Sequence, residues 1–279
     1  MKKILKKILI PLTKNDLVWF FLEPFSKIGT ILNNFRTYIP EKEKSESRNN
    51  FEKIFFQNLV VQNGPFKGML YPEISSIGSA IYPKLLGCYE KELWETIEYF
   101  KDKKYSEIID IGCAEGYYAV GMALNTKNSK IYAYDTEEKA RVLCNKMATL
   151  NNVSDKIIIR SKLTPEELSS FPFSGRGLII CDCEGFEKEL FNKNNVKNLI
   201  NCDLIIEAHD FFDINISTYL KEIFNESHDI HSIQSIDDIQ KALTYNINGL
   251  EKLTLLDKKS ILAEGRMSIM EWLIFIPKK

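Results

Sequence analysis

Short apolar runs recur along the chain after Tyr105, and they limit the possible fold more than any other feature of the sequence. Segments with a helical spacing of apolar residues separate most of these runs. Buried parallel strands joined by crossover helices produce this alternation. The last run leaves no room for a following helix, which favours an antiparallel strand at a sheet edge. The pattern therefore predicts a doubly wound α/β fold. The runs are EIIDIG (107–112), KIYAYD (130–135), KIIIRS (156–161), GLIICD (177–182), DLIIEA (203–208) and MEWLIFIP (270–277).

The first 82 residues lack this alternation, and we expect them to form an N-terminal extension of helix, linker and short β flap. The polar run from Glu41 to Asn50 contains almost no apolar residue and predicts the linker. Residues 51–62 and 66–72 are expected to be two extended pieces of the flap. Helical spacing begins at Pro83, so residues 83–279 form the predicted main domain.

The N-terminus begins MKKILKKILI and continues as an apolar stretch to about Phe25. Charged residues interrupt it, and no part approaches the roughly 20 apolar residues that a membrane span requires. We therefore expect an amphipathic helix. Its apolar face either packs on the following domain, which is the commoner arrangement, or makes a peripheral contact with a membrane surface.

Composition argues against one class of partner and indicates a compartment. The 37 Lys and Arg residues balance 38 Asp and Glu residues, which leaves a net charge of -1. With no basic stripe and no interleaved aromatic residues, nucleic acid is not an expected partner. The 6 cysteines form no CxxC pair, as expected of reduced core thiols in a cytoplasmic protein. Cys181 and Cys183 would share a strand face, but a zinc site there would require further ligands.

The loop after the first predicted strand consists largely of small residues. Such residues permit a tight turn and let the backbone approach a ligand closely. A carboxylate at the end of the strand precedes them, and a helical pattern follows from Tyr117. This arrangement predicts a ligand-binding loop. Its residues are Asp110, Gly112, Ala114, Glu115 and Gly116.

A second carboxylate, Asp135, ends the next predicted strand and can accept both ribose hydroxyls of a nucleotide cofactor. A nicotinamide enzyme would share that feature. However, Asp110 would repel a pyrophosphate, whereas it would attract the ammonium and sulfonium groups of S-adenosylmethionine (SAM). The GxAxG spacing of the loop also departs from the GxGxxG that holds a pyrophosphate. We therefore expect SAM as the cofactor.

The ends of the fourth and fifth predicted strands carry a more specific signal. A D-x-E-G-x-E pattern follows the fourth strand, and an I-E-x-H pattern ends the fifth. With these two patterns, the stretch from about Tyr105 to Asp210 resembles the FkbM family of SAM-dependent methyltransferases. The matching residues are Asp182, Glu184, Gly185 and Glu187 in the first pattern, and Ile206, Glu207 and His209 in the second.

This resemblance implies a Rossmann-like methyltransferase sheet, for which we expect seven mostly parallel strands with an antiparallel last strand. It also implies methylation of a hydroxyl on a sugar, glycan or secondary metabolite, so the expected partner is an acceptor with a free hydroxyl. The chain departs from related enzymes after the third strand, where Ser161 and Lys162 replace an acidic residue near the adenine. Acceptor choice is expected to depend on the N-terminal extension.

A hydroxyl that attacks a methyl group needs a base, because it ionises far above neutral pH. His209, with an ordinary pKa of about 6.5, is the first candidate, oriented by Asp210 or Glu207, and Asp182 is the second. Arg266 and Met267 are expected near the acceptor side. The predicted catalytic residues are His209, Asp182, Glu184 and Asp210. The predicted cofactor-binding residues are Asp110, Gly112, Ala114, Glu115, Gly116, Asp135, Thr136, Ser161 and Asp182.

Several alternatives stay open at this level. Asp182 and Glu184 would also suit caps of a helix near Phe186, and His209 would suit a core histidine. With Asp210, these three residues would also suit a divalent ion, although no metal is expected. A non-catalytic SAM-binding module and a nicotinamide oxidoreductase are the rival functions. His228 and His231 are interpreted as structural, and no oligomeric state is indicated.

Overall fold

A computed structural model describes residues 14–278, apart from the side chains of Leu17, Phe21 and residues 33–50. The chain divides into two compact units, Met1–Asn58 and Leu59–Lys279. This boundary differs from the one expected after residue 82, because most of the flap region, from residue 59 onward, lies within the second unit. The basic start of the predicted amphipathic helix lies outside the described residues.

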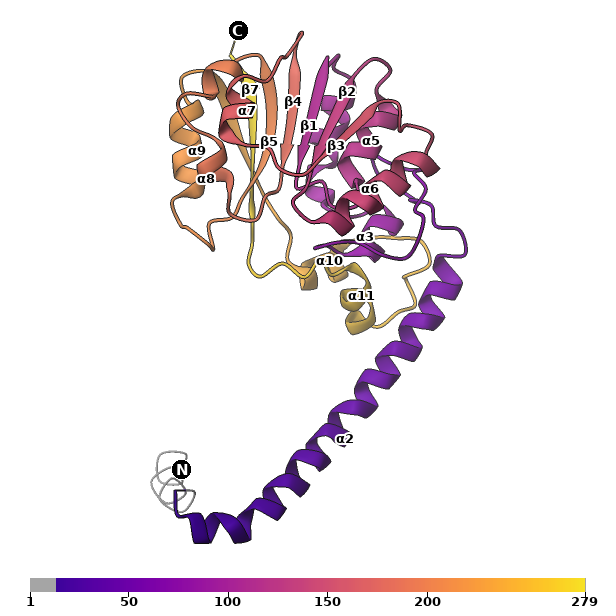
Figure 1. Cartoon of the computed structure of the whole chain (residues 1–279). Coiled ribbons are helices and arrows are strands. Elements are labelled where there is room, and N and C mark those ends of the chain that lie inside the picture. Colours follow the sequence, from indigo (N-terminus) through magenta and orange to yellow (C-terminus); the bar gives the residue numbers. More distant parts are fainter. Residues whose placement is uncertain (1–13, 279) are drawn as a thin grey trace. The chain divides into compact units, whose positions relative to one another are not determined.

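A single long helix, α2 (Asp16–Phe55), makes up the described part of the first unit (Figure 1). The expected linker from Glu41 to Asn50 is therefore helical. Its Glu, Lys and Arg residues are good helix formers, and a lack of apolar residues lowers burial without opposing a helix. Within the described residues, no helix combines the length and apolar character needed to cross a membrane.

The second unit begins within the region expected to be a flap, and residues 51–55, expected to be extended, are part of α2. The two expected extended pieces are reduced to one antiparallel bridge between Val60 and Leu70. Short helices follow, and they lead into the first strand. These helices are α3 (Ile81–Leu86), η1 (Lys91–Leu93) and α4 (Trp94–Lys101).

A seven-stranded sheet with the order β3-β2-β1-β4-β5-β7-β6 forms the centre of this unit. Strands β1 to β5 are parallel, and β7 is antiparallel to both of its neighbours. The predicted α/β class and the antiparallel last strand are confirmed. The strands are β1 (Glu107–Ile111), β2 (Lys130–Tyr134), β3 (Ile157–Arg160), β4 (Gly177–Cys181), β5 (Cys202–Ala208), β6 (His228–Gln234) and β7 (Glu271–Pro277).

The position of β7 differs from the expectation, because β7 lies between β5 and β6 and not at the edge of the sheet. Strand β6 is the edge strand, and much of it is exposed. Its sequence, HDIHSIQ, therefore contains no apolar run. By contrast, the buried strand β7 contains Trp272 and Phe275, both fully buried.

Helices flank the sheet, and the order of the strands reverses between β1 and β4 (Figure 1). Right-handed crossovers therefore place α5 and α6 on one face and α8 on the other. Ligands bind at such reversal points, outside the carboxyl ends of the strands. The helices are α5 (Tyr117–Asn125), α6 (Glu138–Leu150), α7 (Pro165–Ser169), α8 (Glu187–Leu190), η2 (Val196–Asn198) and α9 (Ile216–Phe224).

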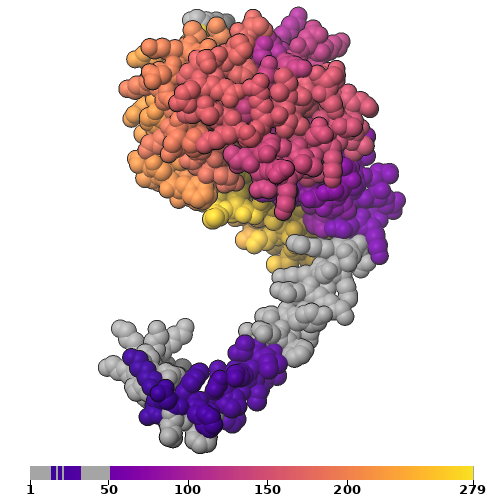
Figure 2. Space-filling view, in the orientation of Figure 1, coloured from indigo at the N-terminus to yellow at the C-terminus, as the bar shows by residue number. Residues whose placement is uncertain are grey.

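Two further helices, α10 (Asp238–Thr244) and α11 (Leu255–Leu262), are inserted between β6 and β7. They lie near the carboxyl ends of the parallel strands, where α11 contacts α3. Figure 2 shows the same arrangement, with the yellow late segment beside the purple early segment at one end of this unit. The carboxyl end of the sheet is thus enclosed by parts of the chain that are far apart in sequence.

Candidate active site

A cavity of about 460 Å³ opens at the carboxyl ends of β1, β2, β3 and β4. Its position at the reversal of strand order is the one expected for a ligand site in this type of sheet. Most of the predicted cofactor-binding residues line it, but Glu115 and Gly116 do not. The predicted residues along its wall are Asp110, Gly112, Ala114, Asp135, Thr136, Ser161, Asp182 and Glu184.

The loop between β1 and α5 depends on glycine at two points. Gly112 has a φ of +79°, and a Cβ there would lie 1.7 Å from the carbonyl oxygen of Asp182. Gly116 has a φ of +94°, and a Cβ there would lie 2.8 Å from Sγ of Cys144. The absence of side chains thus brings the loop against the end of β4 and against α6.

Asp135 is anchored by the backbone at the end of β2. Its Oδ2 accepts a hydrogen bond from the Ala114 amide at 2.8 Å, and its Oδ1 accepts one from the Glu137 amide at 2.8 Å. Each oxygen keeps a further lone pair, because a carboxylate offers about four acceptor positions. Asp135 is therefore fixed in place and still able to accept hydrogen bonds from the hydroxyl groups of a ligand in the cavity.

Asp110 is buried at the base of the loop, and its Oδ2 accepts a hydrogen bond from the Ala119 amide at 2.8 Å. Burial raises the pKa of Asp110 to about 8, and the nearby carboxylates of Asp135 and Asp182 also raise it. Near neutral pH the side chain is therefore largely protonated until a cation arrives beside it. A cationic cofactor that binds beside Asp110 is thus expected to displace the proton of its carboxyl group.

Glu115 faces away from the cavity and forms a buried ion pair. Its Oε1 lies 2.6 Å from Nζ of Lys84, and Tyr71 and Ser76 donate hydrogen bonds to its carboxylate. Glu115 is fully buried. Its contacts tie the loop to the segment before α3, which makes Glu115 a structural partner of the cavity wall and not a part of its lining.

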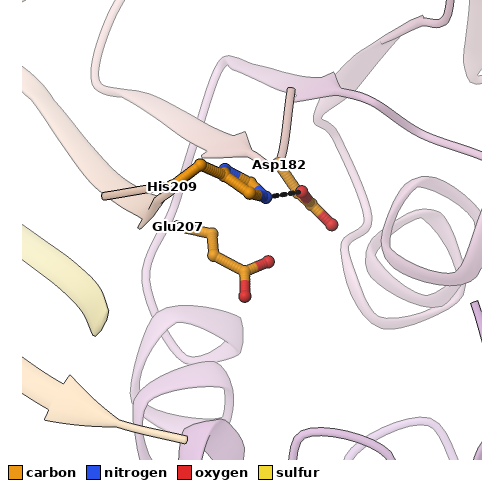
Figure 3. Close-up of side chains that lie close together, drawn as sticks. All are labelled: Asp182, Glu207 and His209. Atoms are coloured by element: carbon orange, nitrogen blue, oxygen red, sulfur yellow. Dashed lines mark ion pairs between the residues drawn. The ribbon is translucent and has the colours of Figure 1, made fainter. Parts of the chain in front are cut away.

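Asp182 and His209 lie together at the ends of β4 and β5, as Figure 3 shows. Nε2 of His209 is 3.4 Å from Oδ1 of Asp182 and 3.6 Å from Oε2 of Glu184. Nδ1 of His209 is 2.7 Å from Oε1 of Glu187. His209 is almost fully buried and lies behind Asp182 and Glu184, which line the cavity.

The charges around His209 change its proton affinity. Burial alone would lower the pKa of His209, but the hydrogen bond with Glu187 and the nearby carboxylates of Asp182 and Glu184 together raise it. Burial raises the pKa of Asp182, which the charge of His209 opposes. Asp182 and His209 thus shift the pKa of one another at the edge of the cavity.

Asp210 does not join this group. Its carboxylate accepts hydrogen bonds from the Ser217 amide at 2.8 Å and from the Ser217 hydroxyl at 2.6 Å, near the start of α9. Asp210 therefore has a helix-capping role. His228 is buried between Ser227 and the Cys202 carbonyl, as a structural histidine would be.

Glu207 points toward the inserted segment and pairs with Arg266. Arg266 also pairs with Glu90 at 2.6 Å and with Glu264 at 3.2 Å. Glu207 and Glu90 are almost completely buried, and Arg266 is 14% exposed. Arg266 therefore contacts three carboxylates beneath the cavity, one of which, Glu264, also pairs with the buried Lys241 at 2.6 Å.

Asp182, Glu207 and His209 each offer one atom within 4.8 Å of the others, which makes them the metal-competent group among the described residues. The expected alternative set contained Glu184 and Asp210 in place of Glu207. A divalent ion would thus be held by two carboxylates and an imidazole. Glu207 already has a cationic partner in Arg266, which lowers its need for a metal.

Sequence reasoning did not assign a role in this region to Glu187, Lys84 or Glu90. It also did not predict the ion pairs of Arg266. Glu187 is the last residue of the D-x-E-G-x-E pattern, so this pattern could have indicated that Glu187 belongs to the site with His209. Lys84 and Glu90 lie before the first strand and have no pattern in common with the strand ends. Only the fold brings Lys84 to the cavity wall and Glu90 to Arg266.

One curated protein and several solved structures are similar to parts of this chain. The chain matches no family model. It is 35% identical over 66 residues to the release factor glutamine methyltransferase of Flavobacterium psychrophilum, a match that covers 24% of this chain and 23% of that protein. The chain thus corresponds to less than a quarter of the length of this curated relative.

Three solved structures illustrate the likeness in fold. TomG, an O-methyltransferase from Streptomyces achromogenes solved with SAM, is 9% identical, with a TM-score of 0.46 over 68% of this chain and 80% of TomG. The Bacillus cereus O-methyltransferase solved with S-adenosylhomocysteine (SAH) is 11% identical, with a TM-score of 0.45 over 67% and 80%. An rRNA methylase from Streptococcus thermophilus is 11% identical, with a TM-score of 0.45 over 67% and 96%.

Proposed function

We propose that this chain is a SAM-dependent methyltransferase of the FkbM type, acting on a hydroxyl of a sugar, glycan or secondary metabolite. One observation carries the proposal: a single cavity brings together the glycine loop after β1, Asp135 after β2 and Asp182 after β4. Its volume lies within the range of about 300–1,000 Å³ that is usual for cofactor sites.

The residues present fit SAM group by group. Asp135 is fixed by two backbone amides and keeps lone pairs for ribose hydroxyls. The loop at Gly112 has no side chain and lets a ligand approach the backbone. Asp110 lies beneath this loop, and in its ionised form it would attract an ammonium or sulfonium group.

When bound, SAM would supply an electrophilic methyl group on its sulfonium. Asp182 lines the cavity and would accept the hydrogen bond of the acceptor hydroxyl. As the acceptor oxygen attacks, its O–H bond breaks, and the proton passes to Asp182 and on to Nε2 of His209. Glu187 holds the imidazole from the other side through Nδ1. Proton removal by a positioned base of this kind typically accelerates a reaction by about 10²–10⁴-fold.

The charge on the acceptor side supports a neutral or cationic acceptor. Asp182 and Glu184 face the cavity, and Glu187 and Glu207 lie behind them. A phosphate backbone would be repelled by these carboxylates, so we do not include nucleic acid among the acceptors. The 6 cysteines are free thiols, which supports a cytoplasmic location as part of this proposal.

Calorimetry with SAH, SAM and NAD tests the cofactor assignment directly. We expect micromolar binding of SAH and SAM and no binding of NAD. Tighter binding of NAD than of SAM would overturn the assignment in favour of an oxidoreductase. SAM binding without turnover on any hydroxyl acceptor would favour the non-catalytic module.

A further inference from the structure

The first two turns and the middle of α2, up to Leu32, have one apolar side. Large apolar residues recur there at spacings of three and four, which places them on one face of the helix. Three of them, Phe25, Ile28 and Leu32, are 73%, 53% and 63% exposed. A stripe of this kind normally faces a protein core, so its exposure points to a surface that the helix binds. This apolar face consists of Leu22, Phe25, Ile28, Ile31 and Leu32.

Polar contacts mark the other side of the same stretch. Nζ of Lys27 lies 2.9 Å from Oε1 of Glu23, about one helical turn away. The hydroxyl of Thr30 donates a hydrogen bond to the Ser26 carbonyl at 3.0 Å. At about 3.6 residues per turn, these four residues lie on the side of the helix opposite the apolar face. The stretch is therefore amphipathic, with its charged groups directed away from the apolar side chains.

The first unit provides no core for this face among the residues that the structure describes. There, α2 is the only regular element of the unit. A single helix cannot cover its own apolar side. The surface that covers the apolar face therefore has to come from outside this helix.

The residues that precede α2 differ in charge from the rest of the chain. Residues 1–14 contain five lysines and no Asp or Glu. Taking these five from the 37 Lys and Arg residues leaves 32, against all 38 Asp and Glu residues, for the rest of the chain. A positively charged segment therefore stands directly before the apolar face, and the remainder of the chain is acidic. The five lysines are Lys2, Lys3, Lys6, Lys7 and Lys14.

An anionic membrane surface matches both features. Amphipathic helices bind at the boundary between headgroups and acyl chains, with the apolar face buried and the polar face toward water. Lysines near an anionic leaflet add electrostatic attraction to this burial. Stable attachment generally needs two signals of this kind, and the N-terminal region of this chain contains both.

A second copy of the chain fits the apolar face less well. A two-stranded coiled coil uses a narrow seam of apolar residues that repeats every 3.5 residues. Leu22 and Ile31 lie roughly half a turn apart around the helix axis, so the apolar face is wider than such a seam. Pro24 lies within the stretch, and an interior proline removes a backbone hydrogen bond and kinks a helix. A parallel pair would also bring together the lysines of both copies, which repel one another.

We infer that the apolar face of α2 and the lysines of residues 1–14 bind an anionic membrane surface, with Glu23 and Lys27 directed toward water. The inference uses residues of the first unit alone, so it does not depend on the proposed methyl transfer. It gives the first unit a role in locating the protein and leaves the chemistry to the second.

The test measures co-sedimentation of the full chain with lipid vesicles. Vesicles of phosphatidylcholine mixed with phosphatidylglycerol are negatively charged, whereas vesicles of phosphatidylcholine alone are neutral. We expect binding to the charged vesicles to be at least about 10-fold stronger, because several lysines contribute. High salt should weaken this binding, since it screens exposed charges.

Two pairs of substitutions on α2 test the apolar face. Phe25→Gln/Ile28→Gln removes two large apolar side chains and should weaken binding to the charged vesicles by about 10-fold or more, because their burial in the membrane is lost. Ser26→Gln/Thr30→Gln is the matched control, since it places the same side chains on the polar side, and it should bind like the wild type. Circular dichroism checks that both variants remain helical.

Two further pairs test the lysines. Lys6→Gln/Lys7→Gln should weaken binding to the charged vesicles by about 10-fold to 30-fold. Lys127→Gln/Lys139→Gln removes the same charge from two exposed positions of the second unit and should have no effect.

Failure of the wild type to bind charged vesicles would overturn the inference, and so would equal losses in the two pairs on α2. Sedimentation velocity without lipid tests the rival occupant: a wild-type dimer that Phe25→Gln/Ile28→Gln converts to a monomer, with no vesicle binding, would assign the apolar face to a second copy. None of these results affects the calorimetric test of SAM and SAH binding, so the proposed function stands or falls separately.

Discussion

Oε1 of the fully buried Glu187 lies 2.7 Å from Nδ1 of His209. The neutral imidazole has one N–H donor, and a carboxylate at this distance places that proton on Nδ1. Nε2 is then the free acceptor, and it is the nitrogen that faces Asp182. Glu187 therefore determines which nitrogen of His209 can take up a proton from the cavity.

Replacing this carboxylate should change the pH dependence of methyl transfer. Glu187→Gln retains a hydrogen-bond acceptor but removes the negative charge that raises the pKa of His209. The rate of the wild type should increase with pH through a pKa above 6.5, because His209 must lose its proton to act as a base. In the variant this acid limb should move to lower pH, and the maximal rate should fall by about tenfold or more, the scale of a lost hydrogen bond to a charged group. Glu189→Gln, an exposed position in the same helix, is the control and should leave the profile unchanged.

Removing the imidazole should separate chemistry from cofactor binding. His209→Ala should lower turnover by about 10²–10⁴-fold, the usual effect of losing a general base, with SAH affinity unchanged because His209 does not line the cavity. Single-turnover rates and calorimetry measure the two effects. If His209→Ala kept the wild-type turnover, His209 would be only a core histidine. Activity lost to a chelator and restored by Mg²⁺ would instead favour a metal held by Asp182, Glu207 and His209.

Asp135 should contribute to binding of the nucleoside equally in ligands with and without the amino-acid part. Asp135→Asn removes the charge that would receive the ribose hydroxyls and should weaken SAH and 5′-methylthioadenosine equally, by about 1–3 kcal/mol. The melting temperature monitors the loss of the contacts to Ala114 and Glu137. An affinity equal to that of the wild type would remove Asp135 from the binding site.

Cofactor binding should release a proton from Asp110. Its pKa of about 8 means that the carboxyl is mostly protonated at pH 7, whereas the approach of a cationic ligand favours the ionised form. The affinity for SAH should therefore increase as the pH is raised from 7 toward 8. Calorimetry in buffers with different ionisation enthalpies counts the protons, and Asp110→Asn is the reference that isolates this contribution. The same proton count in wild type and Asp110→Asn would contradict the prediction.

A methyl group at position 112 should disrupt the cavity. The Cβ of Gly112→Ala would lie 1.7 Å from a carbonyl oxygen, in addition to the strain of a φ of +79°. Strain of this kind alone costs about 1–3 kcal/mol, and we expect a larger loss of stability together with loss of SAH binding. Gly68→Ala provides the control, since Gly68 has a φ of +94° with no atom within 4 Å of the added Cβ. Chemical denaturation of both variants measures the difference, and equal losses would show that the contact with Asp182 is unimportant.

Local patterns in the sequence predicted the strands and the residues at their ends, since each buried strand needs its own apolar run. They did not reveal β6, because an exposed edge strand has no such need, or the helical state of Glu41 to Asn50, because charged residues are compatible with a helix. They also assigned the orienting role for His209 to Asp210 or Glu207, its near neighbours in sequence. In the structure, the residue beside Nδ1 of His209 is Glu187. Contacts between the ends of different strands depend on the direction in which each side chain points, and the spacing of residues in the sequence does not give that direction.

The guanidinium of Arg266, which joins Glu90, Glu207 and Glu264, also affects how the protein can be made. During synthesis the carboxylates at positions 90 and 207 leave the ribosome long before their cation does, and β6 is made before β7, the strand to which it is bonded. Buried carboxylates without a partner are strongly destabilising. We therefore expect the cleft to close only after the last strand is made, and a sheet edge left unpaired until then is prone to aggregation.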